Sequence, residues 1–195
     1  MTRWHYLSIA VLLIILVGLL WYSPTPILSD LTQAPTEKLK QYPSAYLTNT
    51  KTTQYDNNGK ISHMLTASRM RYFDGIYNIA DGTVLIDDPL ITLFSENSPP
   101  ESPWIASSLQ GKGNQNIDEI VLTGNVVLKQ TLNDTFTTMT SELLLIKPEQ
   151  QYAETDKPVM IKTESGVTTA DGLKMSLGDG IIEFPANVRS QYHVR

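Results

Sequence analysis

From Ser44 onward, the sequence is patterned for β-strands throughout. Segments that alternate apolar and polar residues, or that are rich in β-branched and aromatic residues, recur between clusters of Gly, Asn and Asp. These turn residues tolerate positive φ and suit tight connections between strands. The pattern predicts an all-β sandwich, barrel or roll. The expected strands are Ala45–Tyr55, Lys60–Arg69, Val84–Asp87, Leu90–Ser95, Trp104–Leu109, Glu119–Thr123, Val126–Thr131, Phe136–Thr140, Leu143–Lys147, Val159–Thr163, Gly166–Ala170, Leu173–Leu177, Ile181–Phe184 and Val188–His193.

A weak internal repeat runs through this β-patterned part. Each unit opens on a small or hydroxyl residue and reaches a Val after a strand and a turn. Units of this kind usually stack side by side, which favours a stacked antiparallel roll over a closed sandwich. The opening triplets are Thr66-Ala67-Ser68, Ile105-Ala106-Ser107, Thr140-Ser141-Glu142 and Thr169-Ala170-Asp171, and the Val residues are Val84, Val126, Val159 and Val188.

The N-terminal stretch Trp4–Ser29 carries no Asp, Glu, Lys or Arg. Its first 19 residues, Trp4–Tyr22, are almost continuously apolar and have aromatic residues at both ends. A helix of this length is about enough to cross a bilayer core of roughly 30 Å. The alternative is a cleaved signal peptide, but the residues after the apolar run fit a cleavage site poorly. We therefore expect an uncleaved anchor at residues 1–22.

The charge flanking this anchor predicts its orientation. Arg3 and the α-amino group should stay in the cytoplasm, so the rest of the chain is exported. Residues 23–43 hold several Pro and predict an extended periplasmic linker. Residues 44–195 then form a periplasmic β-domain. The predicted localisation is the inner membrane, crossed once.

Charge and composition exclude several classes of function. The chain has no Cys and a net charge of −5. Of its 15 basic residues only Arg3 precedes residue 30, so the exported part has 14 basic and 20 acidic residues, a net −6. Disulfides, thiolate metal sites and a lipoprotein anchor are impossible. The absence of a global positive field argues against nucleic-acid binding.

Candidate catalytic residues are few. His63 lies in an expected strand, where a wall residue of a sheet is the simpler interpretation than a catalytic base. The acidic pairs Asp87-Asp88 and Asp118-Glu119 are neighbours, whose side chains point to opposite faces of a strand. No His pair has metal-ligand spacing, and there is no Gly-rich phosphate loop or nucleophile elbow. No enzyme activity, metal or other cofactor is therefore expected.

What remains is an apolar face with consistent parity in several expected strands. Two interpretations are open: an ordinary β core, or a groove for an apolar ligand such as acyl chains. Leu85, Ile91 and Leu93 also make the opposite face apolar, which is compatible with partial burial on both sides. The candidate interior residues are Ile61, Leu65, Ala67, Val84, Ile86, Leu90, Thr92, Phe94, Ile120, Leu122, Val126 and Leu128.

Several short motifs resemble one known family, the bitopic inner-membrane component C of the lipopolysaccharide export machinery of Gram-negative bacteria (LptC family). Their order and spacing hold over about Thr50–Tyr192, and the anchor, linker and length agree with the family as well. The motifs are Tyr55-x3-Gly59-x-Ile61, His63-x-Leu65-x-Ala67, Met70-x-Tyr72, Pro89-Leu90-x-Thr92-x-Phe94, Trp104 with Ala106, Leu122-x-Gly124-x-Val126-x-Leu128, Gly172-Leu173-Lys174-Met175 and Val188-Arg189-Ser190.

This resemblance implies a twisted, open antiparallel β-jellyroll (OstA-like). It implies a non-enzymatic domain that accepts lipopolysaccharide from an inner-membrane ABC transporter (LptB2FG-like) and passes it to a periplasmic bridge protein (LptA-like). Acyl chains would lie among the interior residues. Assembly would be by strand pairing at two exposed edges. The transporter edge would include Tyr46, Leu47, Thr48, Thr50 and Tyr55, and the bridge edge Ile182, Phe184, Val188, Ser190 and Tyr192.

Two other classes stay open. The domain could be a membrane-tethered scaffold that joins partners through its edges without binding lipid. An anchored periplasmic hydrolase is the third, and it has almost no support among the residues.

Overall fold

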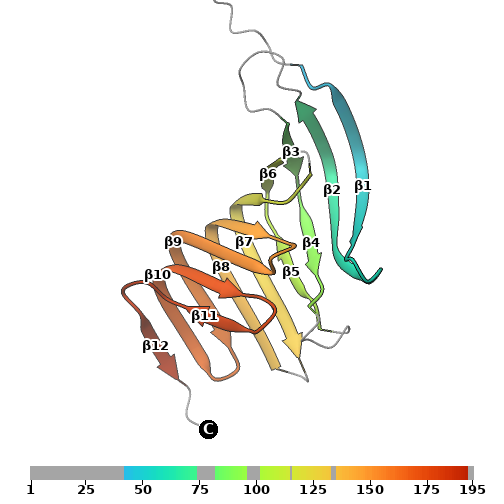
Figure 1. The fold of residues 1–195 in the computed structure, drawn as a ribbon. Coiled ribbons are helices and arrows are strands. Elements are labelled where there is room, and N and C mark those ends of the chain that lie inside the picture. The colour runs from blue at the N-terminus through green and yellow to red at the C-terminus, as the bar shows by residue number, and fades with distance from the viewer. Residues whose placement is uncertain (1–41, 74–81, 96–101, 115, 133–134, 193–195) are drawn as a thin grey trace, which may run out of the picture. The chain divides into compact units, whose positions relative to one another are not determined.

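The computed structural model describes residues 42–73, 82–95, 102–114, 116–132 and 135–192, and these form one 12-stranded antiparallel sheet (Figure 1). The all-β prediction is confirmed for this part of the chain. The strands are β1 (Ala45–Tyr55), β2 (Ile61–Phe73), β3 (Thr83–Asp87), β4 (Leu90–Leu93), β5 (Trp104–Ser107), β6 (Gln110–Asn114), β7 (Ile120–Leu132), β8 (Thr135–Lys147), β9 (Tyr152–Thr163), β10 (Gly166–Ser176), β11 (Ile181–Glu183) and β12 (Arg189–Tyr192).

The sheet has two branches between β2 and β7. One branch runs β2-β3-β6-β7 and the other β2-β4-β5-β7. Beyond β7 the order is β8-β9-β10, and β10 pairs with both β11 and β12. Strand β1 pairs with β2 at the other end of the sheet. We call the part containing β3, β6 and β11 half-sheet A, and the part containing β4, β5 and β12 half-sheet B.

The two half-sheets meet along a line that we call the corner. It crosses the long strands β1, β2, β7, β8, β9 and β10. It passes through Asp88-Pro89 between β3 and β4, and through Ser108-Leu109 between β5 and β6. The pairing register shifts between Thr123 and Val126 in β7, between Thr140 and Leu145 in β8, and between Asp171 and Leu173 in β10. Several residues on this line have positive φ: Asn49, Asp88, Gly124, Asn125, Gly172 and Asn187. Extra residues of this kind bend a strand and change the face to which its side chains point.

Small and hydroxyl-bearing side chains satisfy backbone groups at the corner. The Ser68 hydroxyl donates to the Asp87 carbonyl over 3.0 Å and to an Asp88 carboxylate oxygen over 2.8 Å. The Ser141 hydroxyl donates to the Pro158 carbonyl over 3.1 Å. Buried polar backbone groups without such partners are costly. Two of the four opening triplets supply these hydroxyls, at Ser68 and Ser141, and all four triplets lie at or beside the corner in their strands.

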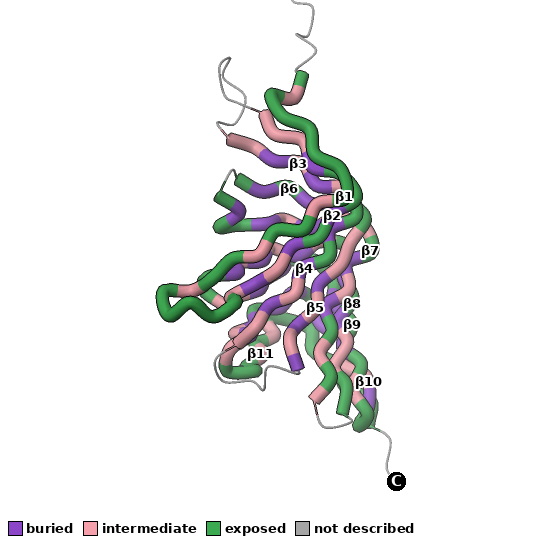
Figure 2. Tube along the Cα trace, turned by 90° about the vertical axis from the view of Figure 1, so that its right-hand side faces the viewer, coloured by how far each residue is buried: buried purple, intermediate pink, exposed green. Residues whose placement is uncertain are grey.

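Both half-sheets contribute side chains to a single hydrophobic core (Figure 2). One inward row of paired residues illustrates its continuity, since each member lies opposite the next in the adjacent strand. The row runs Leu65, Ile91, Ala106, Leu128, Met139 and Ile161, from β2 through β4, β5, β7 and β8 to β9. All of these side chains are buried. The apolar alternation in the sequence therefore describes one buried surface that continues across most of the sheet.

The observed strands differ from the expected ones in three main ways. Two are longer than expected, since β2 continues to Phe73 and β9 begins at Tyr152 rather than Val159. The expected pairs of strands around Gly124, Ser141 and Gly172 are single strands, β7, β8 and β10, which continue through the corner. Strand β6 was not expected, because Gln110–Asn114 has no apolar residue. Its inward positions are Gly111 and Gly113, both buried, where added side chains would meet Ile86, Leu122 or the Glu119 backbone.

The expected anchor at residues 1–22 and most of the expected linker at 23–43 lie outside the described residues. Among those that are described, no helix is long and apolar enough for a membrane crossing. The domain boundaries stay a prediction.

Candidate functional site

Most of the predicted interior residues line the shared core. They come from β2, β3 and β7, and each is almost inaccessible to solvent. These buried residues are Leu65, Ala67, Val84, Ile86, Ile120, Leu122, Val126 and Leu128. Their burial agrees with an inward-facing apolar surface, and contact with a ligand stays a prediction.

The predicted parity was wrong in β4. Leu90 is 42% exposed, whereas its neighbour Ile91 is 0% exposed and Leu93 is also buried. Leu90 and Thr92 lie opposite Thr66 and Met64 on the outer face. The physical cause is Asp88, the extra corner residue with φ 51°, which reverses the parity between β3 and β4. The alternation of Val84 and Ile86 therefore continues in Ile91 and Leu93.

The prediction was also wrong for Ile61, which is 39% exposed, and Phe94 is only partly buried, so both lie at the rim of the core rather than inside it. Both line a hollow of about 910 Å³ together with residues of the β1–β2, β8–β9 and β10–β11 turns, among them Lys60, Glu149 and Asp179. None of the residues lining this hollow belongs to the buried core. The hollow therefore lies outside the core and leads up to its edge.

Several interior residues were not included in the prediction. They lie in β2, β5 and the later strands β8 to β10, whose alternation continues the same pattern. Following that alternation beyond β7 would have found most of them. They are Met70, Trp104, Met139, Leu144, Ile146, Ile161, Leu173, Met175 and Leu177.

The strand ends farthest from the corner meet at what we call the mouth. Here the ends of β4 and β5, in half-sheet B, approach the β8–β9 turn and the end of β10, in half-sheet A. Three hydrogen bonds join the two sides, and we call them the clasp. The donors are Trp104 Nε1 to the Leu177 carbonyl (3.1 Å), Gln151 Nε2 to the Phe94 carbonyl (3.1 Å) and Ser95 Oγ to the Gly178 carbonyl (3.3 Å).

His63 lies on the inner face beside the mouth. It is opposite Leu93, which in turn lies opposite Trp104. Burial lowers the pKa of His63 below its usual value, and Glu149 on the β8–β9 turn raises it by a smaller amount. The lowered pKa favours the neutral imidazole, and the His63 Nδ1 atom lies 3.4 Å from the Ser62 hydroxyl. This environment fits the interpretation of a wall residue.

The acidic pairs have structural roles at strand ends. Asp87 forms ion pairs with Arg71 over 3.0 Å and with Arg69 over 3.4 Å. Glu119 pairs with Lys147 over 2.9 Å. No group of His, Asp and Glu side chains within the described ranges could hold a metal ion.

The two edges of the sheet carry the predicted partner residues. The predicted transporter-edge residues Tyr46, Leu47, Thr48, Thr50 and Tyr55 all lie in β1, which pairs only with β2 in the described part of the chain. At the other edge, Ser190 and Tyr192 belong to β12 and Val188 directly precedes it. Ile182 of β11 and Phe184 just after it pack partly against the core. A strand added at this edge would therefore contact the backbone of Ile182 and Phe184 more than their side chains.

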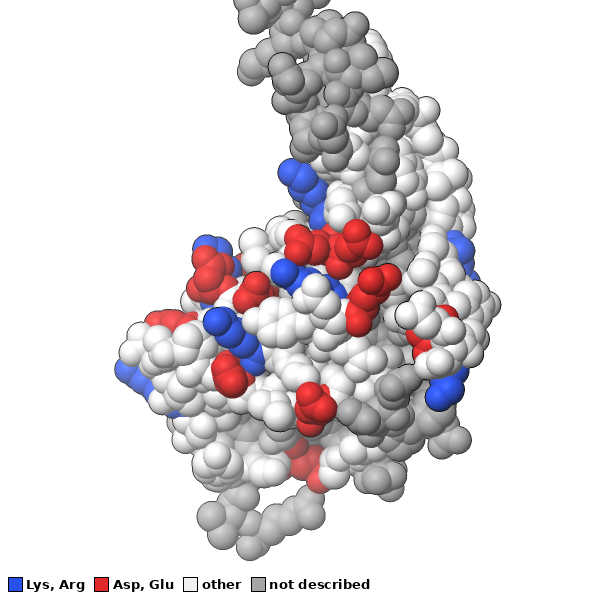
Figure 3. Space-filling model, viewed as in Figure 1, with Lys and Arg blue, Asp and Glu red and all other residues white. Residues whose placement is uncertain are grey.

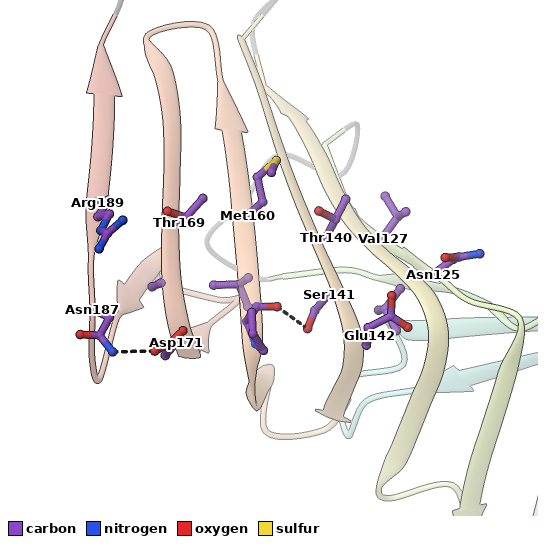
Figure 4. A pocket seen from close by; sticks show the side chains of 14 residues that line it. Asn125, Val127, Thr140, Ser141, Glu142, Met160, Thr169, Asp171, Asn187 and Arg189 are labelled. Carbon is purple, nitrogen blue, oxygen red and sulfur yellow. Dashed lines mark hydrogen bonds between the residues drawn. The ribbon is translucent and has the colours of Figure 1, made fainter.

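A furrow of about 820 Å³ follows the corner across the outer face from β7 to β12. Figure 4 shows its two levels of side chains, with Val127, Thr140, Met160 and Thr169 in one row that ends on Arg189. The second level lies on the corner itself, where the Asn187 amide donates to Asp171 over 2.6 Å. Basic and acidic side chains are interspersed on the face that Figure 3 shows.

The chain is similar to known proteins of lipopolysaccharide transport. One solved structure is LptH from Pseudomonas aeruginosa, described as the LptA homologous periplasmic component of the conserved lipopolysaccharide transport device. It is 9% identical, the match covers 64% of this chain and 95% of LptH, and the TM-score is 0.47. A comparison with curated protein sequences gives no match.

The sequence also matches a family model described as "Lipopolysaccharide-assembly, LptC-related" over residues 7–193. This match covers nearly the whole chain, including the β1 edge, the buried core, the mouth and the C-terminal edge. The resemblance seen in the short sequence motifs is thereby confirmed. The chain belongs to the LptC-related family of lipopolysaccharide-assembly proteins.

Proposed function

We propose that this protein is a non-enzymatic transfer module for lipopolysaccharide. It accepts lipopolysaccharide that an inner-membrane ABC transporter has extracted, and hands it to a periplasmic bridge protein. Family membership supports a general role in lipopolysaccharide transport. The observation that carries the finer proposal is a single apolar core between two sheet edges, β1 at one end and β11 and β12 at the other.

Contact with the apolar core would supply the binding free energy of an acyl chain. Burying a CH₂ group is worth about 0.8 kcal/mol, so a lipid with several long chains gains most of its affinity from apolar contact. The inward row from Leu65 to Ile161 is continuous across the strands from β2 to β9. A ligand held here could move between partners without leaving an apolar surface.

The charge distribution supports a ligand whose acyl chains are buried and whose sugar head stays in solvent. Acidic and basic side chains are interspersed on the face that Figure 3 shows, and the chain as a whole is acidic, with a net charge of −5. A phosphorylated sugar head would gain little from such a surface. The proposal therefore buries the acyl chains and leaves the head in solvent.

The two edges would join the partners by strand addition. Strand β1 would pair with the transporter's periplasmic domains, and β11 and β12 with the bridge protein. Residues 1–22 would anchor the chain in the inner membrane with the N-terminus in the cytoplasm, and the sheet would lie in the periplasm.

A specific observation favours a second candidate, a tether that joins its partners without touching lipid. The core is packed, and its side chains are at most 8% exposed. A scaffold needs the two edges and the anchor only. The difference between the two candidates is whether lipopolysaccharide reaches the inward face.

Adjacent residues in β4 offer a matched test. A small diazirine amino acid replaces inward Ile91 in one variant and outward Leu90 in the other, in full-length chain expressed in a Gram-negative host. The transfer proposal expects lipopolysaccharide crosslinks at position 91 well above those at 90. Equal or absent crosslinks at both positions, in cells that continue to transport lipopolysaccharide, would support the scaffold instead.

A truncation tests the bridge edge separately. Removing the residues after Gly180 deletes β11 and β12 and should abolish capture of the bridge protein. Retention of the bridge protein by this variant would contradict the assignment of the C-terminal edge. Depletion of the whole protein should leave newly made lipopolysaccharide in the inner membrane.

A further inference from the structure

The clasp at the mouth joins two parts of the chain that are far apart in sequence. Ser95 and Gly178 are separated by 83 residues, and Trp104 and Leu177 by 73. On one side the clasp uses the ends of β4 and β5, and on the other the β8–β9 turn and the end of β10. It is formed by side-chain donors and backbone carbonyl acceptors, without a strand ladder.

Behind the clasp the core is closed. Trp104 is 3% exposed, Leu93 is equally buried and Leu177 is 1% exposed. In front of it lies the hollow that contains Ile61, and four clasp residues, Phe94, Ser95, Gln151 and Gly178, form its wall. The clasp therefore separates an open hollow from the packed core.

The chemistry of the clasp suits repeated opening. Its donors are an indole, an amide and a hydroxyl, and its acceptors are backbone carbonyls, so separation leaves no buried charge. Water can replace each partner once the mouth is open. At the corner, by contrast, the half-sheets are joined covalently through β2, β7, β8, β9 and β10. Half-sheets that share these strands can separate only at the mouth.

We infer that the clasp is a releasable closure, and that acyl chains enter the core between the ends of β4 and β5 and the β8–β9 and β10–β11 turns. This inference rests on the proposed transfer function and assigns the entrance for its ligand.

A reversible disulfide tests the inference directly. The chain has no native Cys, so the double variant S95C/G178C can form one intramolecular disulfide only. A Cβ added at Gly178 would lie 3.6 Å from Ser95 Oγ, the atom that the sulfur of the S95C variant replaces. In a disulfide a Cβ lies about 3 Å from the partner sulfur, so a small shift allows the bond to form. The same Cβ would be 2.5 Å from the end of the Gln151 side chain. This flexible group can move, and the G178C variant alone reports any resulting loss of its hydrogen bond to the Phe94 carbonyl.

The measurement is capture of purified lipopolysaccharide by full-length chain that also carries the diazirine at position 91. Oxidised S95C/G178C should capture none above background, and reduction should restore capture to the level before oxidation. Variants S95C and G178C, each alone, report the effects of the substitutions without a crosslink. Mobility under non-reducing conditions verifies that the disulfide has formed.

The outcomes separate the entrance from the function. Equal capture by the oxidised and reduced forms overturns the clasp inference and leaves the transfer function standing. No capture by the chain with native Ser95 and Gly178 overturns both. Selective loss on oxidation supports both.

A second variant keeps the inference falsifiable if the disulfide variant folds poorly. S95A/Q151N removes the hydroxyl donor and shortens the amide side chain, and Asn tolerates the positive φ of 48° at position 151. Weakening the clasp should speed lipopolysaccharide capture several-fold. An unchanged or slower rate would overturn the inference.

Discussion

The corner and the mouth join the same two half-sheets by opposite means. At the corner the chain itself passes from one half-sheet to the other, and hydroxyl groups such as Ser141 Oγ satisfy the carbonyls that the bend releases. At the mouth three hydrogen bonds connect strand ends that are distant in sequence. The comparison indicates that a bent sheet can be strong along one line and separable along the other. The following predictions test this difference.

The largest effect is expected at the corner, from Gly172→Ala. Gly172 has φ 92°, and its added Cβ would lie 2.9 Å from Pro185 Cγ and 3.1 Å from the Thr155 carbonyl oxygen. Left-handed strain of about 1–2 kcal/mol and overpacking of about 1–3 kcal/mol should both lower the free energy of unfolding. Denaturant unfolding measures the change.

Gly180→Ala is the matched control for this substitution. Gly180 also has positive φ, 67°, but nothing lies within 4 Å of its added Cβ. It should lose only the strain contribution, about 1–2 kcal/mol. Equal losses in the two variants would contradict the role of close packing at the corner.

A smaller effect is expected at the mouth, from Trp104→Phe. The variant loses the hydrogen bond to Leu177 and some buried volume, and should be destabilised by about 1–3 kcal/mol. Hydrogen exchange should accelerate at the Leu177 amide, which donates to the Gln151 carbonyl over 2.7 Å. Both residues lie on the β8–β9 and β10 side of the mouth, and that side loses its hydrogen bond to Trp104 in the variant. If exchange accelerates equally at the corner, the mouth does not open independently.

Ser141→Ala should cost less, about 0.5–1.5 kcal/mol, because it removes one hydrogen bond from the Pro158 carbonyl. Thr140→Ala is the control, since Thr140 is an exposed neighbour on the outer face. That substitution should change stability by less than about 0.5 kcal/mol. A Ser141 variant as stable as the Thr140 variant would mean that the Pro158 carbonyl at the bend does not need the Ser141 hydroxyl as its hydrogen-bond donor.

The smallest effect is expected in the pH dependence of stability. Burial lowers the pKa of His63 below 6.5 in the folded protein, so the unfolded chain binds a proton more readily. This contribution to stability is complete above about pH 6.5 and is lost as the pH falls from there through the folded pKa. His63→Gln should flatten the slope of unfolding free energy in that window, and an unchanged slope would assign it to other groups.

The sequence predicted more of the corner than of the mouth. Apolar alternation predicted the inward faces of β2, β3 and β7, because burial selects side chains at every second position. The repeat marked the corner, although its physical cause was not apparent. The face of Leu90 was wrong because one residue, Asp88, reverses parity, and β6 was missed because buried Gly111 and Gly113 leave no apolar signal.

The clasp could not be predicted for a different reason. Its donors are a Trp at the start of one strand, a Gln in one turn and a Ser just after another strand, and its acceptors are carbonyl groups that any residue carries. Nothing local distinguishes Gln151 from its neighbour Gln150. Contacts between such groups depend on where the folded half-sheets bring them, and only the three-dimensional structure contains that information.

The corner also restricts the strands of other chains that could be added to this sheet. It reaches both edges, at Asn49 in β1 and at Asn187 between β11 and β12, and both residues have positive φ. Any strand that extends the sheet along its whole length must bend where it passes the corner. A straight strand, or one bent elsewhere along its length, would pair with one half-sheet and diverge from the other. The position of the bend therefore restricts which added strands could pair along their whole length, and in which register.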